Sequence, residues 1–505
     1  MDDYRLTRKE KAAIPLLCLL SSALFLMICS RSSFLYPFND WVDVQIYFTT
    51  GKSIFNGKVL YKDIFEQKGL IIFLIYGIAY LISHTTLIGG YIMEVISMSW
   101  LTYLAYKTAL YMSSKKTAAY MIALTPALAT MFTYSFRQGG SSDELMLPFI
   151  YLPIYYLIKT YKLKKTIVPD RKAALAIGVA TGVVLWCKYN SIAVAGVYAI
   201  AILIYCLRRK TFKELLSAVL FFALGVAIVT MPVMLYFIVN GAVKDMFTCY
   251  FYDNIFLYSG VKEDSSFMLN FTIALIAVFD FAVKDFPVFL FVLVGIGGAV
   301  SDFRKKKNAM SLTLIAMTLL DFVMVFGTGR YMTYYSEAFV IFALPGVGYA
   351  LRFFEKKFKK KDFKFFTVIA AGLFVVLGIL APFVSKNTFY MKYKKEDLWQ
   401  YQIASIVNES EDKSSLCANY LDLGIYTLTD TVPEEKFFSI SNVQLPEMYS
   451  TVAQAVKDSR VEYLVLKDDV SDFYLENYEV VYHASSFYEY EDVPLEVYLL
   501  RRTAG

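Results

Sequence analysis

Residues 65–82 read FEQKGLIIFLIYGIAYLI and place a glutamate and a lysine directly before an apolar run. A helix that crosses the hydrocarbon core of a bilayer needs about 20 apolar residues, so this run is short for a full crossing. Charges at the edge of an apolar helix cost free energy unless water or a counter-charge compensates them. Lys68 therefore raises the question of which anion it meets there, and the rest of the chain has to answer it.

Long apolar blocks recur along most of the chain. It has 505 residues, of which 57% are hydrophobic, and the blocks run from about residue 13 to about residue 384 between short charged clusters. Many blocks reach the length of a spanning helix. The sequence therefore predicts an all-α polytopic membrane protein. We interpret residues 13–30 as an uncleaved signal anchor, because that block lacks a clear cleavage site and many similar blocks follow it.

The distribution of charge argues against a nucleic-acid partner, and the cysteine spacing argues against a metal site. The net charge is +6, but the basic residues cluster at the ends of apolar blocks. That is the positive-inside pattern of membrane proteins, so we expect no nucleic-acid partner. The six cysteines have no metal-ligand spacing, and a disulfide between Cys249 and Cys417 is not favoured.

Basic clusters also allow the crossings to be counted, since an even number of crossings must separate two cytoplasmic clusters. Parity is satisfied if the runs at 70–83 and 267–283 do not cross, the first because it is short and the second because Asp280 interrupts it. The count is about eleven crossings, with a cytoplasmic N-terminus and an extracytoplasmic C-terminus. The crossing runs are approximately 13–30, 87–112, 117–134, 145–160, 173–186, 189–207, 214–239, 285–301, 308–327, 332–351 and 364–384.

The tail of the chain differs from the rest, because it is acidic and aromatic. Residues 461–469 and 479–484 have the pattern of strands, and residues 449–459 have the pattern of a helix. We therefore expect a transmembrane domain over residues 1–384 and a small extracytoplasmic α/β domain over residues 385–505.

The first outer loop, residues 32–70, is dense in carboxylates, aromatic residues and glycines. Asp43 opens an amphipathic helix, Gly57 begins a Gly-Lys-x-x-Tyr-x-Asp motif that contains Tyr61 and Asp63, and an acid-Gln-Lys-Gly motif ends in the apolar run. This order resembles the first outer loop of the GT-C glycosyltransferases. The likeness is closest to the bacterial enzymes akin to protein O-mannosyltransferases and aminoarabinose transferases.

The resemblance implies transfer of a sugar from a polyprenyl-phosphate carrier on the outer face of the membrane. Those enzymes have an acidic residue after the first crossing, matched by Asp43, and a lysine before a short helix, matched by Lys68. A second outer loop carries another acid, for which Glu144 in FRQGGSSDELMLPF (136–149) is the candidate and Asp143 the rival. The first motif is often an adjacent acidic pair, whereas Asp40 and Asp43 are three apart, so the base is left open between them.

The chemistry of such a carrier needs two protein groups. The phosphate is a stable leaving group, so we expect a carboxylate to take the proton from the acceptor hydroxyl, with inversion at the anomeric carbon. A cation must stabilise the departing phosphate. The resemblance gives the first role to Asp43 and the second to Lys68, while Glu144 orients the acceptor or shares the base role.

Other residues are candidates for binding the substrates. Arg137 and Arg330 are further phosphate ligands, and Arg330 lies in the tyrosine-rich segment GTGRYMTYY (327–335) together with Tyr334. Lys188 lies at a third outer turn, where we expect it to snorkel from a helix end. Glu94 and Asp321 interrupt apolar runs and are expected to face the bundle interior.

These residues imply a set of partners. They are a polyprenyl-phosphate-linked sugar, membrane lipid and a cell-envelope acceptor, which is a wall polymer, a glycolipid or a protein. No cofactor is expected; a divalent metal bound by carboxylates is not favoured. A transporter or flippase of lipid-linked sugars is the alternative, and a polymerase of lipid-linked units shares the carrier. Charges gathered in outer loops favour the transferase over the flippase.

Overall fold

The computed structural model describes residues 6–258, 267–327, 332–443, 445–486 and 495–503. The chain forms two compact units. Unit 1 consists of Met1–Ser30, Tyr91–Val233 and Lys262–Phe389, and unit 2 consists of Arg31–Gly90, Met234–Val261 and Tyr390–Gly505.

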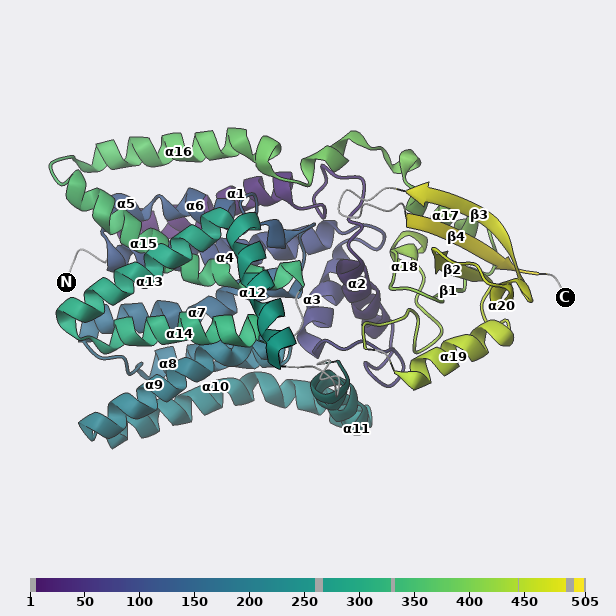
Figure 1. Ribbon diagram of the computed structural model, residues 1–505, viewed down its shortest axis with the longest axis horizontal. Helices are drawn as coiled ribbons and strands as arrows, with labels where there is room; N and C mark the ends of the chain where they lie inside the picture. Colours follow the sequence, from purple (N-terminus) through teal and green to yellow (C-terminus); the bar gives the residue numbers. More distant parts are fainter. Residues whose placement is uncertain (1–5, 259–266, 328–331, 444, 487–494, 504–505) are drawn as a thin grey trace. The chain divides into compact units, whose positions relative to one another are not determined.

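Unit 1 is helical, and most of its helices run alongside one another (Figure 1). Two of them, α4 and α10, continue into unit 2. The α-helices are α1 (Arg8–Cys29), α4 (Ile88–Met112), α5 (Lys115–Ala118), α6 (Met121–Ala129), α7 (Ser142–Lys164), α8 (Arg171–Leu185), α9 (Ala193–Arg209), α10 (Phe212–Val239), α12 (Phe267–Lys284), α13 (Phe286–Lys306), α14 (Ala309–Phe326), α15 (Val340–Lys357) and α16 (Phe363–Val384). Three short 3-10 helices join them: η2 (Tyr134–Phe136), η3 (Tyr189–Ile192) and η5 (Thr333–Phe339).

Among the described residues, seven helices are long and apolar enough to cross a membrane. They are α1, α9 extended by η3, α10, α13, α14, α15 extended by η5, and α16. The other four predicted crossings also contain helices, but α8 is short, the run at 117–134 is divided into α5 and α6, and α4 and α7 are less apolar. The predicted class, a polytopic helical membrane protein, is confirmed, while the count of eleven crossings and the side of each terminus stay predictions.

Two charged residues lie inside the apolar helices of unit 1. Glu94 in α4 is fully buried, and Asp321 in α14 is 5% exposed. A carboxylate that faced lipid at mid-bilayer would cost about 3 kcal/mol on insertion scales. Both side chains lie inside the protein, as their positions in apolar runs predict.

Unit 2 combines the first outer loop with the tail of the chain. Its first part holds α2 (Val42–Phe55) and α3 (Leu70–Ile82), and its middle part holds α11 (Val243–Met246) and the π-helix η4 (Phe247–Tyr258). The tail has a four-stranded sheet in the order β1-β2-β4-β3, in which only β1 and β2 are parallel. These strands are β1 (Ser415–Cys417), β2 (Tyr463–Lys467), β3 (Tyr478–Ser486) and β4 (Leu495–Arg502).

The helices of the tail complete a small α/β fold (Figure 1). They include α17 (Trp399–Asn408), α18 (Ile425–Thr429), α19 (Pro446–Lys457) and α20 (Asp472–Leu475), with the 3-10 helices η6 (Thr388–Lys392) and η7 (Lys395–Asp397) before them. The two predicted strands correspond to β2 and β3, and the predicted helix corresponds to α19. The small C-terminal α/β fold is therefore confirmed.

Helix α2 packs against α3 through glycines. A Cβ atom on Gly51 would lie 2.6 Å from the backbone nitrogen of Gly77 and 2.6 Å from the carbonyl oxygen of Phe73. The ring of Phe55 covers Gly77 in the same way, since a Cβ atom there would lie 2.2 Å from that ring. The two helices therefore approach closely at positions where any larger side chain would separate them.

The opposite side of α2 is bonded to the tail. Thr49 donates a hydrogen bond of 2.6 Å to the Asp422 carboxylate. The ammonium group of Lys52 lies 2.8 Å from Asp430 and donates 3.0 Å to the carbonyl oxygen of Tyr426. The first outer loop and residues 390–505 thus form one compact unit, and the division at residue 385 stays a prediction.

All six cysteines are free and buried. Cys249 and Cys417, whose pairing was considered from the sequence, both belong to unit 2 and form no disulfide.

Candidate functional site

The two acidic residues at the start of α2 have different surroundings. Asp40 forms an ion pair of 2.6 Å with Arg31, and both side chains are 1% exposed. The Arg31 guanidinium also lies over the ring of Tyr390, at 4.3 Å. Asp43 is half-buried and lies in the first turn of α2, where the helix dipole favours a negative charge. The N-cap is Trp41, so Asp43 is not the N-cap residue of α2.

Lys68 lies directly before α3, in a loop whose backbone is tightly held. The hydroxyl group of Tyr61 donates 2.5 Å to the carbonyl oxygen of Lys68, and the Lys68 amide donates 2.5 Å to Glu66. Tyr61 has a left-handed backbone, with φ of 68°, and its buried ring stacks on Phe237 at 5.6 Å. Asp63 closes the preceding turn by accepting 2.8 Å from the amide of Val59.

The Lys68 side chain is half-buried, and the next residue, Gly69, is the N-cap of α3 without a side-chain cap. The free amides of a helix N-terminus attract anions. An ammonium group next to such a terminus gives this end of the loop the character of an anion site.

Glu66 connects the two predicted functional residues. Burial raises the pKa of the Glu66 carboxyl; the charge of Lys68 lowers this pKa, and the charge of Asp43 raises it. Asp43, Glu66 and Lys68 therefore share one electrostatic environment within unit 2. The sequence contained Glu66 in the acid-Gln-Lys-Gly motif, but nothing in the motif showed that it would be buried or that the charge of Asp43 would raise its pKa.

In unit 1, Glu144 lies in the first turn of α7, and the preceding loop binds its carboxylate. Its side chain accepts 2.7 Å from the amide of Gly140, and its own amide donates 2.8 Å to Ser141, the N-cap of α7. Gly139 and Gly140 have φ of 84° and 92°, which glycine adopts without strain. The hydroxyl group of Ser141 also donates 3.0 Å to Glu337.

Three buried glutamates lie near the start of α7 in unit 1. Glu94, Glu144 and Glu337 are each at most 1% exposed, and the charge of Glu144 interacts with those of the other two. Within the described part of the chain, one oxygen of Glu144 and one of Glu337 have no hydrogen-bond partner. Such atoms are costly to bury unless a partner arrives. Sequence reasoning missed Glu337, which lies in an apolar run.

Asp143 forms an ion pair with Lys188, for which the sequence predicted a different role. The ammonium group of Lys188 lies 2.7 Å from both oxygens of Asp143. The same group lies 5.4 Å and 4.8 Å from the ring centres of Tyr334 and Tyr335. Lys188 was expected to snorkel from a helix end, and that expectation is wrong because Asp143 and two aromatic rings surround its charge. Both Asp143 and Tyr334 thus contact Lys188.

Arg137 follows η2 and has a left-handed backbone, with φ of 52°. Its guanidinium donates 3.4 Å to Thr333, and its carbonyl oxygen accepts 2.6 Å from Asn387. Asp285 fixes the preceding η2 by accepting from the amide and the hydroxyl group of Ser135. Arg330 lies outside the described residues.

No group of three or more His, Cys, Asp or Glu side chains is arranged as a metal site in the ranges that the structure describes. The metal requirement of the protein stays a prediction.

A family model described as "Putative competence-induced protein Ccs4 N-terminal domain" matches residues 2–285. The match covers more than half of the chain. No curated protein matches the sequence.

Solved structures with the same fold include glycosyltransferases of the membrane. ArnT from Cupriavidus metallidurans, bound to undecaprenyl phosphate, is 11% identical with a TM-score of 0.58, over 98% of this chain and 98% of that chain. Its apo state is 12% identical with a TM-score of 0.59, over 97% and 98%. An oligosaccharyltransferase from Archaeoglobus fulgidus, in complex with Zn and sulfate, is 12% identical with a TM-score of 0.53, over 89% of this chain and 68% of that chain. The chain therefore has the GT-C fold.

Proposed function

Since this chain belongs to the competence-induced protein Ccs4 family and has the GT-C fold, we propose that it is an integral membrane glycosyltransferase. The donor is a sugar on a polyprenyl-phosphate carrier, and the acceptor is an extracytoplasmic wall polymer, glycolipid or protein. The ArnT structure with undecaprenyl phosphate supports the choice of carrier.

One observation carries this proposal: α2 and α3 pack side by side in the same direction, with Tyr47 against Phe73 and Phe55 on Gly77, so that Asp43 in the first turn of α2 and Lys68 before α3 lie toward the same end of the pair. A base and a phosphate ligand have to belong to the same site, and Asp43 and Lys68 are 25 positions apart in the sequence. Their shared electrostatic environment supports a common site in unit 2.

Lys68 binds the carrier phosphate in this proposal. As the bond between the sugar and the phosphate breaks, negative charge grows on the phosphate oxygens, and a fixed cation stabilises that charge. The hydrogen bonds from Tyr61 and to Glu66 hold the Lys68 backbone before the substrate arrives. The stabilisation therefore needs little rearrangement of the protein.

Asp43 is the proposed general base. Its carboxylate takes the proton from the acceptor hydroxyl while the acceptor oxygen attacks the anomeric carbon, and the phosphate leaves from the opposite side with inversion. Asp40 suits this role less well, because Arg31 already holds it in a buried ion pair.

The other candidate residues keep the roles that were predicted for them from the sequence. Glu144 orients the acceptor or shares the base role, and Arg137 contributes to phosphate binding. Asp143 and Tyr334 contact Lys188 and would act on substrates through it. No metal is required in this proposal, and Arg330 is a further candidate for phosphate binding.

The proposal is tested with the purified full-length chain and a radiolabelled polyprenyl-phosphate sugar in liposomes, with an envelope fraction as acceptor. We expect radiolabel to appear in a covalent, lipid-free product, and we expect EDTA to leave the rate unchanged. Movement of intact donor across the bilayer without such a product would identify a flippase. Label found only in lengthened lipid-linked chains would identify a polymerase. Either outcome overturns the proposal.

A further inference from the structure

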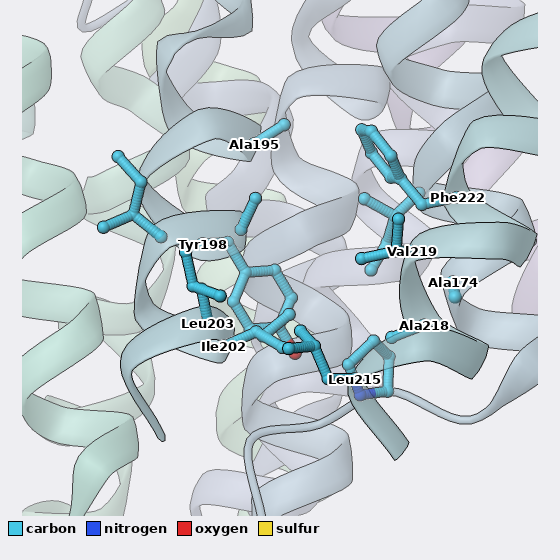
Figure 2. A pocket seen from close by; sticks show the side chains of 13 residues that line it. Ala174, Ala195, Tyr198, Ile202, Leu203, Leu215, Ala218, Val219 and Phe222 are labelled. Carbon is cyan, nitrogen blue, oxygen red and sulfur yellow. The ribbon is translucent and has the colours of Figure 1, made fainter. Parts of the chain in front are cut away.

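A hollow of about 320 Å³ lies between α8, α9 and α10 in unit 1, and almost all of its lining is apolar. Figure 2 shows Tyr198, Ile202 and Leu203 of α9 facing Leu215, Val219 and Phe222 of α10. We name this hollow the α8–α9–α10 groove. Its size lies near the lower end of the range of about 300–1,000 Å³ that ligand pockets have.

Close packing on one side and an open rim on the other create the groove. A Cβ atom on Gly178 of α8 would lie 2.1 Å from the carbonyl oxygen of Phe222, so α8 and α10 are in backbone contact there. Tyr198 is 1% exposed and donates 2.7 Å to the carbonyl oxygen of Ile167. Ile200 and Val219, in contrast, are 58% and 52% exposed. The groove is therefore open along the surface of helices that include two candidate membrane spans.

A cluster of exposed basic residues lies at one end of these three helices, where α8 begins, α9 ends and α10 begins. It is formed by Arg171, Lys172, Arg208, Arg209, Lys210 and Lys213. Within the part of the chain that the structure describes, none of the six forms an ion pair. The guanidinium of Arg171 lies over the ring of Phe221, at 5.5 Å, next to the groove residue Phe222. Asp170 is already paired with Lys164, at 2.9 Å.

An apolar groove that ends at a basic cluster matches the two parts of an anionic lipid. An acyl chain needs an apolar, open-sided channel, and its phosphate needs unpaired basic residues at the end of that channel. We propose that the α8–α9–α10 groove binds one acyl chain of an anionic phospholipid, whose headgroup phosphate contacts Arg171, Lys172 and Lys213. This site is separate from the proposed donor site, and it does not depend on the proposed function.

The phosphate contact is tested by native mass spectrometry of the detergent-solubilised full-length chain. The probes are dipalmitoyl phosphatidylglycerol, dipalmitoyl phosphatidylcholine, undecaprenyl phosphate and glycerol phosphate. We expect phosphatidylglycerol to bind more tightly than phosphatidylcholine and glycerol phosphate. The Arg171→Gln/Lys172→Gln/Lys213→Gln variant should bind phosphatidylglycerol about 100-fold more weakly, because each basic residue near an anionic headgroup contributes about fivefold. It should bind undecaprenyl phosphate as the wild type does, because the proposed site of that lipid is at Lys68.

The matched control removes the same charges elsewhere in unit 1. The Arg304→Gln/Lys305→Gln/Lys306→Gln variant changes one arginine and two lysines at the exposed end of α13 and should bind phosphatidylglycerol as the wild type does. Equal loss in both variants would show a general charge effect and overturn the site. Equal binding of phosphatidylcholine or equal binding of glycerol phosphate would also overturn it, and so would an equal loss of undecaprenyl phosphate and phosphatidylglycerol binding in the Arg171→Gln/Lys172→Gln/Lys213→Gln variant.

The acyl-chain contact is tested by filling the groove. Ala199→Phe places a ring in the groove, and Ile200→Phe is a second variant at another exposed lining position. Each should weaken phosphatidylglycerol binding at least tenfold, with the elution profile of a folded protein unchanged. Ala223→Phe, at an exposed position of α10 outside the groove, is the control. Wild-type binding in both groove variants would contradict the proposal.

Discussion

Two aspartates three positions apart differ in what surrounds them. The side chain of Asp40 is 1% exposed, and its carboxylate lies 2.6 Å from Arg31, which makes it one half of a buried ion pair. Asp43 is half-buried in the first turn of α2 and shares the environment of Glu66 and Lys68. The same residue type therefore forms a buried ion pair at one position and is the proposed general base at the other.

Asp40→Asn should destabilise unit 2, because it removes the carboxylate that lies 2.6 Å from the buried Arg31 guanidinium. Removal of one partner from a buried ion pair costs about 3 kcal/mol or more. We expect a clear drop in the melting temperature of the purified protein. Asp43→Asn is the matched control and should lower the melting temperature less, because it leaves the Arg31–Asp40 pair intact. Equal stability of the two variants would refute the structural role of Asp40.

At the scale of elements, α2 has two functions that depend on each other. Its first turn carries Asp43, and its buried residues pack on α3 and bond the tail. The position of Asp43 is therefore fixed by the packing of residues further along the same helix, such as Gly51, Thr49 and Lys52.

Gly51→Ala should separate α2 from α3, because the added methyl group would lie 2.6 Å from two backbone atoms of α3. Overpacking of this kind costs about 1–3 kcal/mol. Thermal unfolding should reveal the loss, and the transfer rate should fall with it as Asp43 shifts. Gly372→Ala in α16 is the control, because a Cβ atom there meets nothing within 4 Å. A Gly51→Ala variant as stable as this control would contradict the close approach.

The contact between α2 and the tail should respond to pH. Burial raises the pKa of Asp422 to about 6, although hydrogen bonds from Thr49 and Gly424 and the charge of Lys52 lower it. The unfolded carboxyl has a pKa of about 3.9. The folded state therefore holds this proton more tightly, and the resulting stability is present below about pH 4 and lost as the pH rises through about 6.

Stability should thus fall between pH 4 and pH 7 by an amount on the order of 3 kcal/mol from this group alone. Melting temperatures of the wild type and of Asp422→Asn, measured across that range, test the effect. The asparagine variant should lose this part of the slope. An identical slope in both proteins would show that Asp422 does not titrate in this way.

At the scale of the whole molecule, the sequence predicted the class of fold and some of its parts. Apolar run lengths predicted the helices, and the motifs around Asp43 and Lys68 predicted the GT-C fold that the solved structures share. Strands β1 and β4 were not predicted; β1 has only three residues, which is too short for an alternating pattern to show.

Tertiary pairing explains most of what the sequence did not reveal about the candidate site. Lys188 and Asp143 are 45 positions apart, and no local pattern links them. Glu337 lies in an apolar run and becomes significant only when Ser141 is placed beside it. In the same way, the bond between Thr49 and Asp422 joins residues 373 positions apart.

The central claim is that Lys68 binds the carrier phosphate and Asp43 removes the acceptor proton. Carrier affinity and the single-turnover transfer rate, measured together on one set of variants, separate these roles. Lys62→Ala is the control, because Lys62 is an exposed lysine of the same loop. We expect Lys68→Ala to bind the carrier about tenfold more weakly or worse. Asp43→Asn should keep its affinity and lose about 10²–10⁴-fold in rate. Wild-type turnover in Asp43→Asn, or wild-type affinity in Lys68→Ala, would contradict the claim.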